Sequence, residues 1–108
     1  MLTIAGIKAC DSMKKAFARL DAAGVAYTFM DFKKAAPTPA QVAGWLDAVG
    51  DSLVNRKGTT WRQLSPVEQA ASGDALVALI VARPSLIKRP LLSDGTRVTV
   101  GLDSSLLP

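Results

Sequence analysis

The first third of the chain carries two short apolar runs separated by one amphipathic stretch. Residues 2–5 form an apolar run, which predicts a buried strand. From about residue 11, apolar side chains recur at intervals of three and four, which predicts a helix with one buried face that ends at Gly24. Residues 25–32 are rich in β-branched and aromatic side chains and predict a second strand. A strand, a helix and a strand at this spacing form a βαβ unit with a right-handed crossover.

The middle of the chain is predicted to be helical. Residues 39–49 begin with a proline, which suits a first helical turn, and then show one apolar face. Residues 51–64 are less regular, so we expect short helical turns and an exposed loop there. Ser65 and Glu68 have the spacing of a capping box, which predicts that another helix begins at this point.

The last third combines one very apolar helix with a hairpin. Asp74 is expected to cap a helix whose residues 76–81 are apolar nearly all round, so this helix is predicted to be buried in the core and to end before Pro84. Two short apolar runs follow, at residues 91–92 and 97–100, and an Asp-Gly turn between them indicates a β-hairpin.

The order of these elements favours one fold class. A βαβ unit followed by helices and a hairpin can build one mixed sheet with helices on its faces. We therefore predict an α/β, thioredoxin-like domain with a mixed four-stranded sheet and an inserted helical region. The chain has 108 residues, which suits a single domain over residues 1–108, and a content of 49% hydrophobic and 20% charged residues is typical of a globular protein.

Composition narrows the class of function. The N-terminus has no basic segment followed by a long apolar run, and one cysteine cannot form an internal disulfide, so we expect a cytoplasmic protein without a membrane segment. The net charge of +4 is spread over single and paired cations, which does not favour nucleic acid as a partner. Because there is no histidine, the Ser-His-Asp triad, the Cys-His dyad and most zinc sites are excluded, and no metal or bound cofactor is expected.

Cys10 lies between the first predicted strand and the first predicted helix, which either Asp11 or Ser12 can cap. Free N–H groups at a helix start favour an anion, and Lys8 and Lys14 add cations nearby, so we expect a reactive thiol. The alternative is an inert cysteine that packs as a small apolar residue. Without a second cysteine, an oxidised Cys10 needs an external thiol, for which glutathione is the obvious candidate.

Arg56 and Arg89 are the next candidates for chemistry. Both flank predicted loops, and the planar guanidinium of arginine suits carboxylates, phosphates and other oxyanions. The alternative is that each is a surface cation. Arg89 precedes Pro90 at the start of a predicted strand, a place where a cis peptide bond can occur.

Residues 6–16, GIKACDSMKKA, closely resemble the active-site segment of the ArsC-like proteins. That group contains glutaredoxin-coupled arsenate reductases, Spx regulators and YffB-type proteins. Residues 27–34, 55–62 and 84–90 agree with the YffB-type branch, and the resemblance runs in order from about Leu2 to Leu102. It implies a thioredoxin-like fold with an inserted helical region.

The resemblance also implies roles for single residues. Cys10 corresponds to the nucleophile, Arg56 and Arg89 fall on two anion-binding arginines, and Pro90 falls on the cis proline. The arsenate reductases carry a third anion-binding arginine at a position near Val100, where this chain has no arginine.

This departure, together with the lone cysteine, favours a glutathione-dependent thiol reductase. We expect glutathione as co-substrate, a small disulfide, thiol or oxyanion as substrate, glutaredoxin as a potential partner, and a monomer. Two alternatives stay open. One is an arsenate reductase proper. The other is an Spx-like module that binds RNA polymerase, although Met13 stands where the Spx redox switch has its second cysteine.

Overall fold

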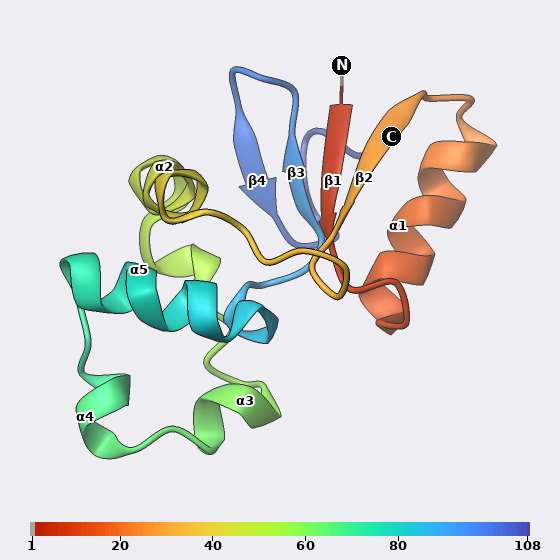
Figure 1. The fold of residues 1–108 in the computed structure, drawn as a ribbon. Coiled ribbons are helices and arrows are strands. Elements are labelled where there is room, and N and C mark those ends of the chain that lie inside the picture. The colour runs from red at the N-terminus through yellow and green to blue at the C-terminus, as the bar shows by residue number, and fades with distance from the viewer. Residues whose placement is uncertain (1) are drawn as a thin grey trace.

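The computed structural model describes residues 2–108. Its core is a mixed sheet with the strand order β2-β1-β3-β4 (Figure 1). The strands are β1 (Leu2–Gly6), β2 (Tyr27–Asp31), β3 (Leu91–Ser93) and β4 (Val98–Val100). β1 and β2 are parallel, whereas β1 with β3 and β3 with β4 are antiparallel. The predicted α/β architecture with a mixed four-stranded sheet is therefore confirmed.

The helical segments lie between these strands. They are α1 (Asp11–Ala22), α2 (Pro39–Val49), η1 (Gly50–Leu53), α3 (Thr59–Arg62), α4 (Pro66–Gln69), α5 (Gly73–Ala82) and η2 (Pro84–Leu86). All except α1 belong to the stretch between β2 and β3, which is the predicted helical insertion. It extends away from the sheet and gives the molecule a long axis of 44 Å (Figure 1). Within residues 2–108, no helix is long and apolar enough to cross a membrane.

The two faces of the sheet support separate apolar clusters, because successive strand residues point to opposite faces. Ile4 and Leu92 pack with α1, whereas Ala5 and Leu91 pack with α2 and α5. Each pair sits side by side in the β1–β3 register. The sheet thus separates α1 from the inserted helices.

The predicted starts of two helices are corrected. Cys10, with an extended backbone at φ −73° and ψ 136°, is the N-cap of α1, so Asp11 is already helical and neither Asp11 nor Ser12 is the cap. Ser72 is the N-cap of α5, and Asp74 lies in its first turn. In both cases the helix begins one or two residues earlier than the capping side chains predict.

Among the described residues, capping boxes are present at both α-helices that begin with a proline, α2 and α4. Ser65 accepts from the Glu68 N–H, and the Glu68 carboxylate accepts from the Ser65 N–H, as predicted. The same reciprocal pair joins Thr38 and Gln41 at α2. Gly24 has φ +68° and ends α1, also as predicted.

The last helix contributes to the core, as predicted, but only with one face. Within α5 only Leu76 and Ile80 are buried. α5 packs against α2 on one side, whereas the short helices α3 and α4 lie beyond its other side (Figure 1). Such short helices cover only part of that side, so Val77, Leu79 and Val81 stay partly exposed.

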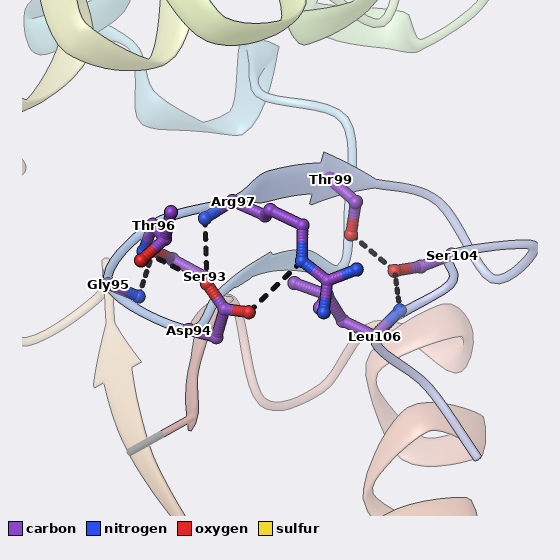
Figure 2. A network of polar contacts seen from close by, with 8 residues as sticks. All are labelled: Ser93, Asp94, Gly95, Thr96, Arg97, Thr99, Ser104 and Leu106. Carbon is purple, nitrogen blue, oxygen red and sulfur yellow. Dashed lines mark hydrogen bonds and ion pairs between the residues drawn. The ribbon is translucent and has the colours of Figure 1, made fainter.

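The β3–β4 hairpin closes around the predicted Asp-Gly turn. The Asp94 carboxylate accepts hydrogen bonds from the backbone N–H groups of Thr96 and Arg97, at 2.9 and 2.7 Å (Figure 2). Those two N–H groups, that of Arg97 first, lower the pKa of Asp94 to about 2. Beyond β4, Ser104 hydrogen-bonds to Thr99 and folds the following segment back against the hairpin.

Candidate functional site

Cys10 ends the loop that leaves the carboxyl end of β1. Its N–H donates to the Ile7 carbonyl at 3.1 Å, and its own carbonyl accepts from the Lys14 N–H at 3.0 Å. The side chain is half-buried and packs against the α1 cluster that contains Met13. No side chain among residues 2–108 caps the first turn of α1. The N–H groups of this turn are therefore open to an anion at the position of the thiol.

Arg89 lies in the segment between η2 and β3, and its side chain contacts the same end of β1. A methyl group placed on Gly6 would lie 3.2 Å from Arg89 Cγ and 2.5 Å from Met13 Sδ, so both side chains pack directly on the Gly6 backbone. The peptide bond between Arg89 and Pro90 is cis, as predicted. Arg89 thus lies beside the strand end that leads to Cys10.

Arg56 lies in the insertion, on a segment that the structure ties to the Arg89 segment. An isolated bridge joins Val54 to Ile87. The Arg56 guanidinium donates to the Asp51 carbonyl at 3.3 Å, lies 3.6 Å from an Asp51 carboxylate oxygen, and its central carbon is 5.1 Å from the centre of the Trp61 ring. No hydrogen bond or ion pair in the described part of the chain connects Arg56 with the thiol.

A basic hollow of about 250 Å³ lies beside Arg56, with Lys57 and Lys88 also in its lining. Lys88 was not predicted as a site residue. A methyl group on Gly101 would lie 3.8 Å from Lys88 Nζ. This ammonium therefore lies next to the position near Val100 at which the arsenate reductases are expected to carry an arginine and this chain does not. Only the hairpin geometry brings residues 88 and 101 together, so the chain alone offers no signal beyond a pair of cations.

The two lysines predicted to flank the thiol belong to different segments, Lys8 to the loop after β1 and Lys14 to α1. Lys14 is exposed on the first turn of α1. Lys8 lines a groove of about 720 Å³ that follows β2, together with the rings of Phe17, Tyr27 and Phe29. Burial and the neighbouring Asp21 carboxylate, which accepts from the Tyr27 hydroxyl at 3.3 Å, raise the pKa of Tyr27.

The geometry therefore comprises a thiol at the N-cap residue of α1, one arginine beside the strand end that leads to it, and a basic hollow on the insertion. In residues 2–108, no group of three metal-ligating side chains is present that could hold an ion. Residues 5–106 match a sequence family described as the ArsC family. The chain belongs to the ArsC family.

Relatives and solved structures agree with this assignment. A YffB protein is 40% identical, with a TM-score of 0.88 over 94% of this chain and 90% of that one. An arsenate reductase related protein from Brucella melitensis is 39% identical, with a TM-score of 0.77 over 93% and 85% of the two chains. An uncharacterized protein of Haemophilus influenzae is 30% identical over 110 residues, which cover 95% of this chain and 92% of the other. The predicted family and its thioredoxin-like fold are confirmed.

Proposed function

We propose that this ArsC-family protein is a thiol-dependent reductase in which Cys10 is the nucleophile and glutathione is the resolving thiol. The observation that carries the proposal is the position of the chain's lone cysteine at the N-cap of α1, where no side chain of the described residues 2–108 caps the first turn. The free N–H groups stabilise negative charge there, which favours the thiolate over the thiol.

The reaction has two thiol–disulfide exchanges. The Cys10 thiolate attacks one sulfur of a disulfide substrate, the S–S bond breaks, and the other sulfur leaves as a thiolate that takes up a proton. Cys10 is then part of a mixed disulfide. A glutathione thiolate attacks this bond, releases the Cys10 thiolate and keeps the substrate sulfur as a glutathione mixed disulfide. Because the chain has no second cysteine, the second exchange requires an external thiol.

Cations near the thiol give glutathione a means of binding. Arg89 lies at the Cys10 end of β1 and suits one carboxylate of glutathione. Arg56 and Lys88 in the basic hollow suit the second carboxylate or a substrate oxyanion. Lys14, one turn into α1, adds long-range attraction for the same anions.

One measurement tests the proposal. Incubation with oxidised glutathione followed by intact mass spectrometry is expected to give one glutathione adduct on the wild type and none on Cys10→Ser. No adduct on the wild type would contradict the role of Cys10.

The position of Lys88 supports arsenate reduction as a second candidate. Its ammonium lies beside Gly101, and Lys88 lines the basic hollow with Arg56, so it would supply a third cation in addition to Arg56 and Arg89. Cys10 and one glutathione would supply two electrons, so that arsenate is reduced to arsenite and loses one oxygen as water, while the two sulfurs end in a mixed disulfide. Arsenate turnover with glutathione and a glutaredoxin, lost in Lys88→Ala, would establish this function. Disulfide reduction without arsenate turnover would leave the first candidate alone.

A further inference from the structure

The groove along β2 lies outside the site described above, and we call it the β2 groove. Its lining comes from β2 itself, from α1, from the loop that follows β1 and from the turn that follows β2. Of the strand residues that line it, Phe29 packs in the α1 cluster and Met30 in the cluster of the opposite face. The β2 groove therefore straddles the edge of the sheet.

That edge is open to another strand. β2 is the outermost strand on its side of the sheet. The Phe32 N–H donates to the Gly6 carbonyl at 3.0 Å, and the register aligns Gly6 with Asp31. In a parallel ladder alternate residues turn their N–H and C=O groups towards the neighbour, so those of Tyr27 and Phe29 point outwards, away from β1. An extended segment can pair with them.

One wall of the β2 groove is aromatic. The rings of Phe17 and Tyr27 are stacked with centres 5.7 Å apart, and the rings of Phe17 and Phe29 meet edge to face at 5.0 Å. All three rings are only partly buried. Side chains of a paired strand alternate between the two faces of the sheet, so every second side chain of a bound segment would contact this wall, and apolar residues suit those positions.

The charges that line the β2 groove are two lysines and two aspartates, and they are unevenly placed. Asp21 accepts from the Tyr27 hydroxyl and so lies where β2 begins. Lys8 and Lys34 follow the carboxyl ends of β1 and β2, where Asp31, which accepts from the Lys33 N–H at 2.9 Å, is the one carboxylate of the lining. Two ammonium groups against one carboxylate leave this end of the β2 groove positive.

We propose that the β2 groove binds an extended acidic segment of a partner protein, which adds to the sheet as a strand beside β2. Main-chain hydrogen bonds to Tyr27 and Phe29 supply the pairing, and the aromatic wall holds alternate apolar side chains. Antiparallel pairing is the more stable arrangement, and it places the N-terminal end of the segment against Lys8 and Lys34. The acidic residues of the partner therefore precede its apolar ones. The proposal does not depend on the chemistry of the thiol.

The test measures fluorescence anisotropy with the labelled peptide acetyl-Glu-Glu-Val-Thr-Val-Thr-Val-amide, using the Cys10→Ser protein so that no disulfide forms. Lys34→Glu is expected to weaken binding about fivefold, the size of one exposed ion pair at its upper limit. Lys33→Glu is the matched control, because Lys33 is exposed next to Lys34 but does not line the β2 groove. A peptide N-methylated at alternate residues on the paired side is expected to bind at least tenfold more weakly, since it cannot donate to β2.

Three results would overturn the proposal. If Lys33→Glu and Lys34→Glu weaken binding equally, the peptide is attracted by the overall positive charge of the protein and not by the β2 groove. Unchanged affinity of the N-methylated peptide would exclude strand pairing. A concentration-dependent dimer in sedimentation, dissociated by Lys34→Glu and not displaced by the peptide, would assign the edge to a second copy of the chain.

Discussion

Gly6 allows two side chains to pack on the strand end that leads to Cys10, and its replacement by alanine tests that arrangement. The added methyl group would lie 2.5 Å from Met13 Sδ, whereas ordinary contacts begin at 3.4 Å. Met13 is completely buried, so its sulfur has no solvent to move into. Overpacking of this kind costs about 1–3 kcal/mol, and for a domain of this size each kcal/mol lowers Tm by about 5 °C.

The assay is urea unfolding, with Gly44→Ala as the control. Gly44 lies inside α2 and a methyl group there meets nothing within 4 Å, so alanine should stabilise the protein by about 0.5–1 kcal/mol. The same glycine-to-alanine change should thus have opposite signs at the two positions. Because Met13 belongs to the first turn of α1, Gly6→Ala should also change the alkylation rate of Cys10, and Gly44→Ala should not.

A double-mutant cycle identifies the clash. Met13→Ala removes the sulfur, so Gly6→Ala should cost at least about 1 kcal/mol less in that background than in the wild type. Equal costs of Gly6→Ala in both backgrounds, or a wild-type-like stability of Gly6→Ala alone, would refute the packing argument.

Three further predictions concern other contacts. Because the pKa of Asp94 is lowered from 3.8 to about 2, its carboxylate stabilises the hairpin fully above pH 3.8, and this effect is lost as the pH falls through about 2. The free energy of unfolding should therefore fall more between pH 4 and 2 in the wild type than in Asp94→Asn, and parallel curves would contradict this. Arg19 donates to the carbonyls of Leu102 and Pro108. Arg19→Ala should therefore speed amide exchange in residues 102–108 selectively, and uniform exchange rates would show that the tail is held otherwise. Thr38→Ala should cost about 1 kcal/mol in urea unfolding through the lost cap of α2, and no loss would mean that the cap is replaced by water.

The strands, the helix at residues 39–49 and the capping box at Ser65 could be predicted because each depends on local spacing. The start of α1 could not, because Cys10 takes the cap position through its backbone dihedrals rather than through its side chain. The extent to which α5 is buried could not be predicted for another reason. An apolar run predicts a buried helix, but how many faces are covered depends on which elements lie around it.

Residues of the candidate site were predictable only where the chain marks them directly. Cys10 is marked by its lone occurrence and Arg89 by the proline that follows it. Lys88 was missed, because its approach to Gly101 follows from the register of the hairpin. Arg56 was predicted to bind an anion, and the structure places its guanidinium against Asp51 and Trp61, both within the same insertion.

The central strand β1 has one neighbour, β2, from the same end of the chain, whereas its other neighbour, β3, arrives only after the whole insertion. Synthesis proceeds from the N-terminus, so the residues of the βαβ unit emerge first. The contacts of Ile4 with Leu92, and of the cluster around Cys10 with Leu107, can form only after the rest of the chain has been made. Closing so long a loop is entropically slow. Until those contacts form, Cys10 has less cover than in the folded protein, and because the chain has no other cysteine, its oxidation cannot trap a wrong internal disulfide.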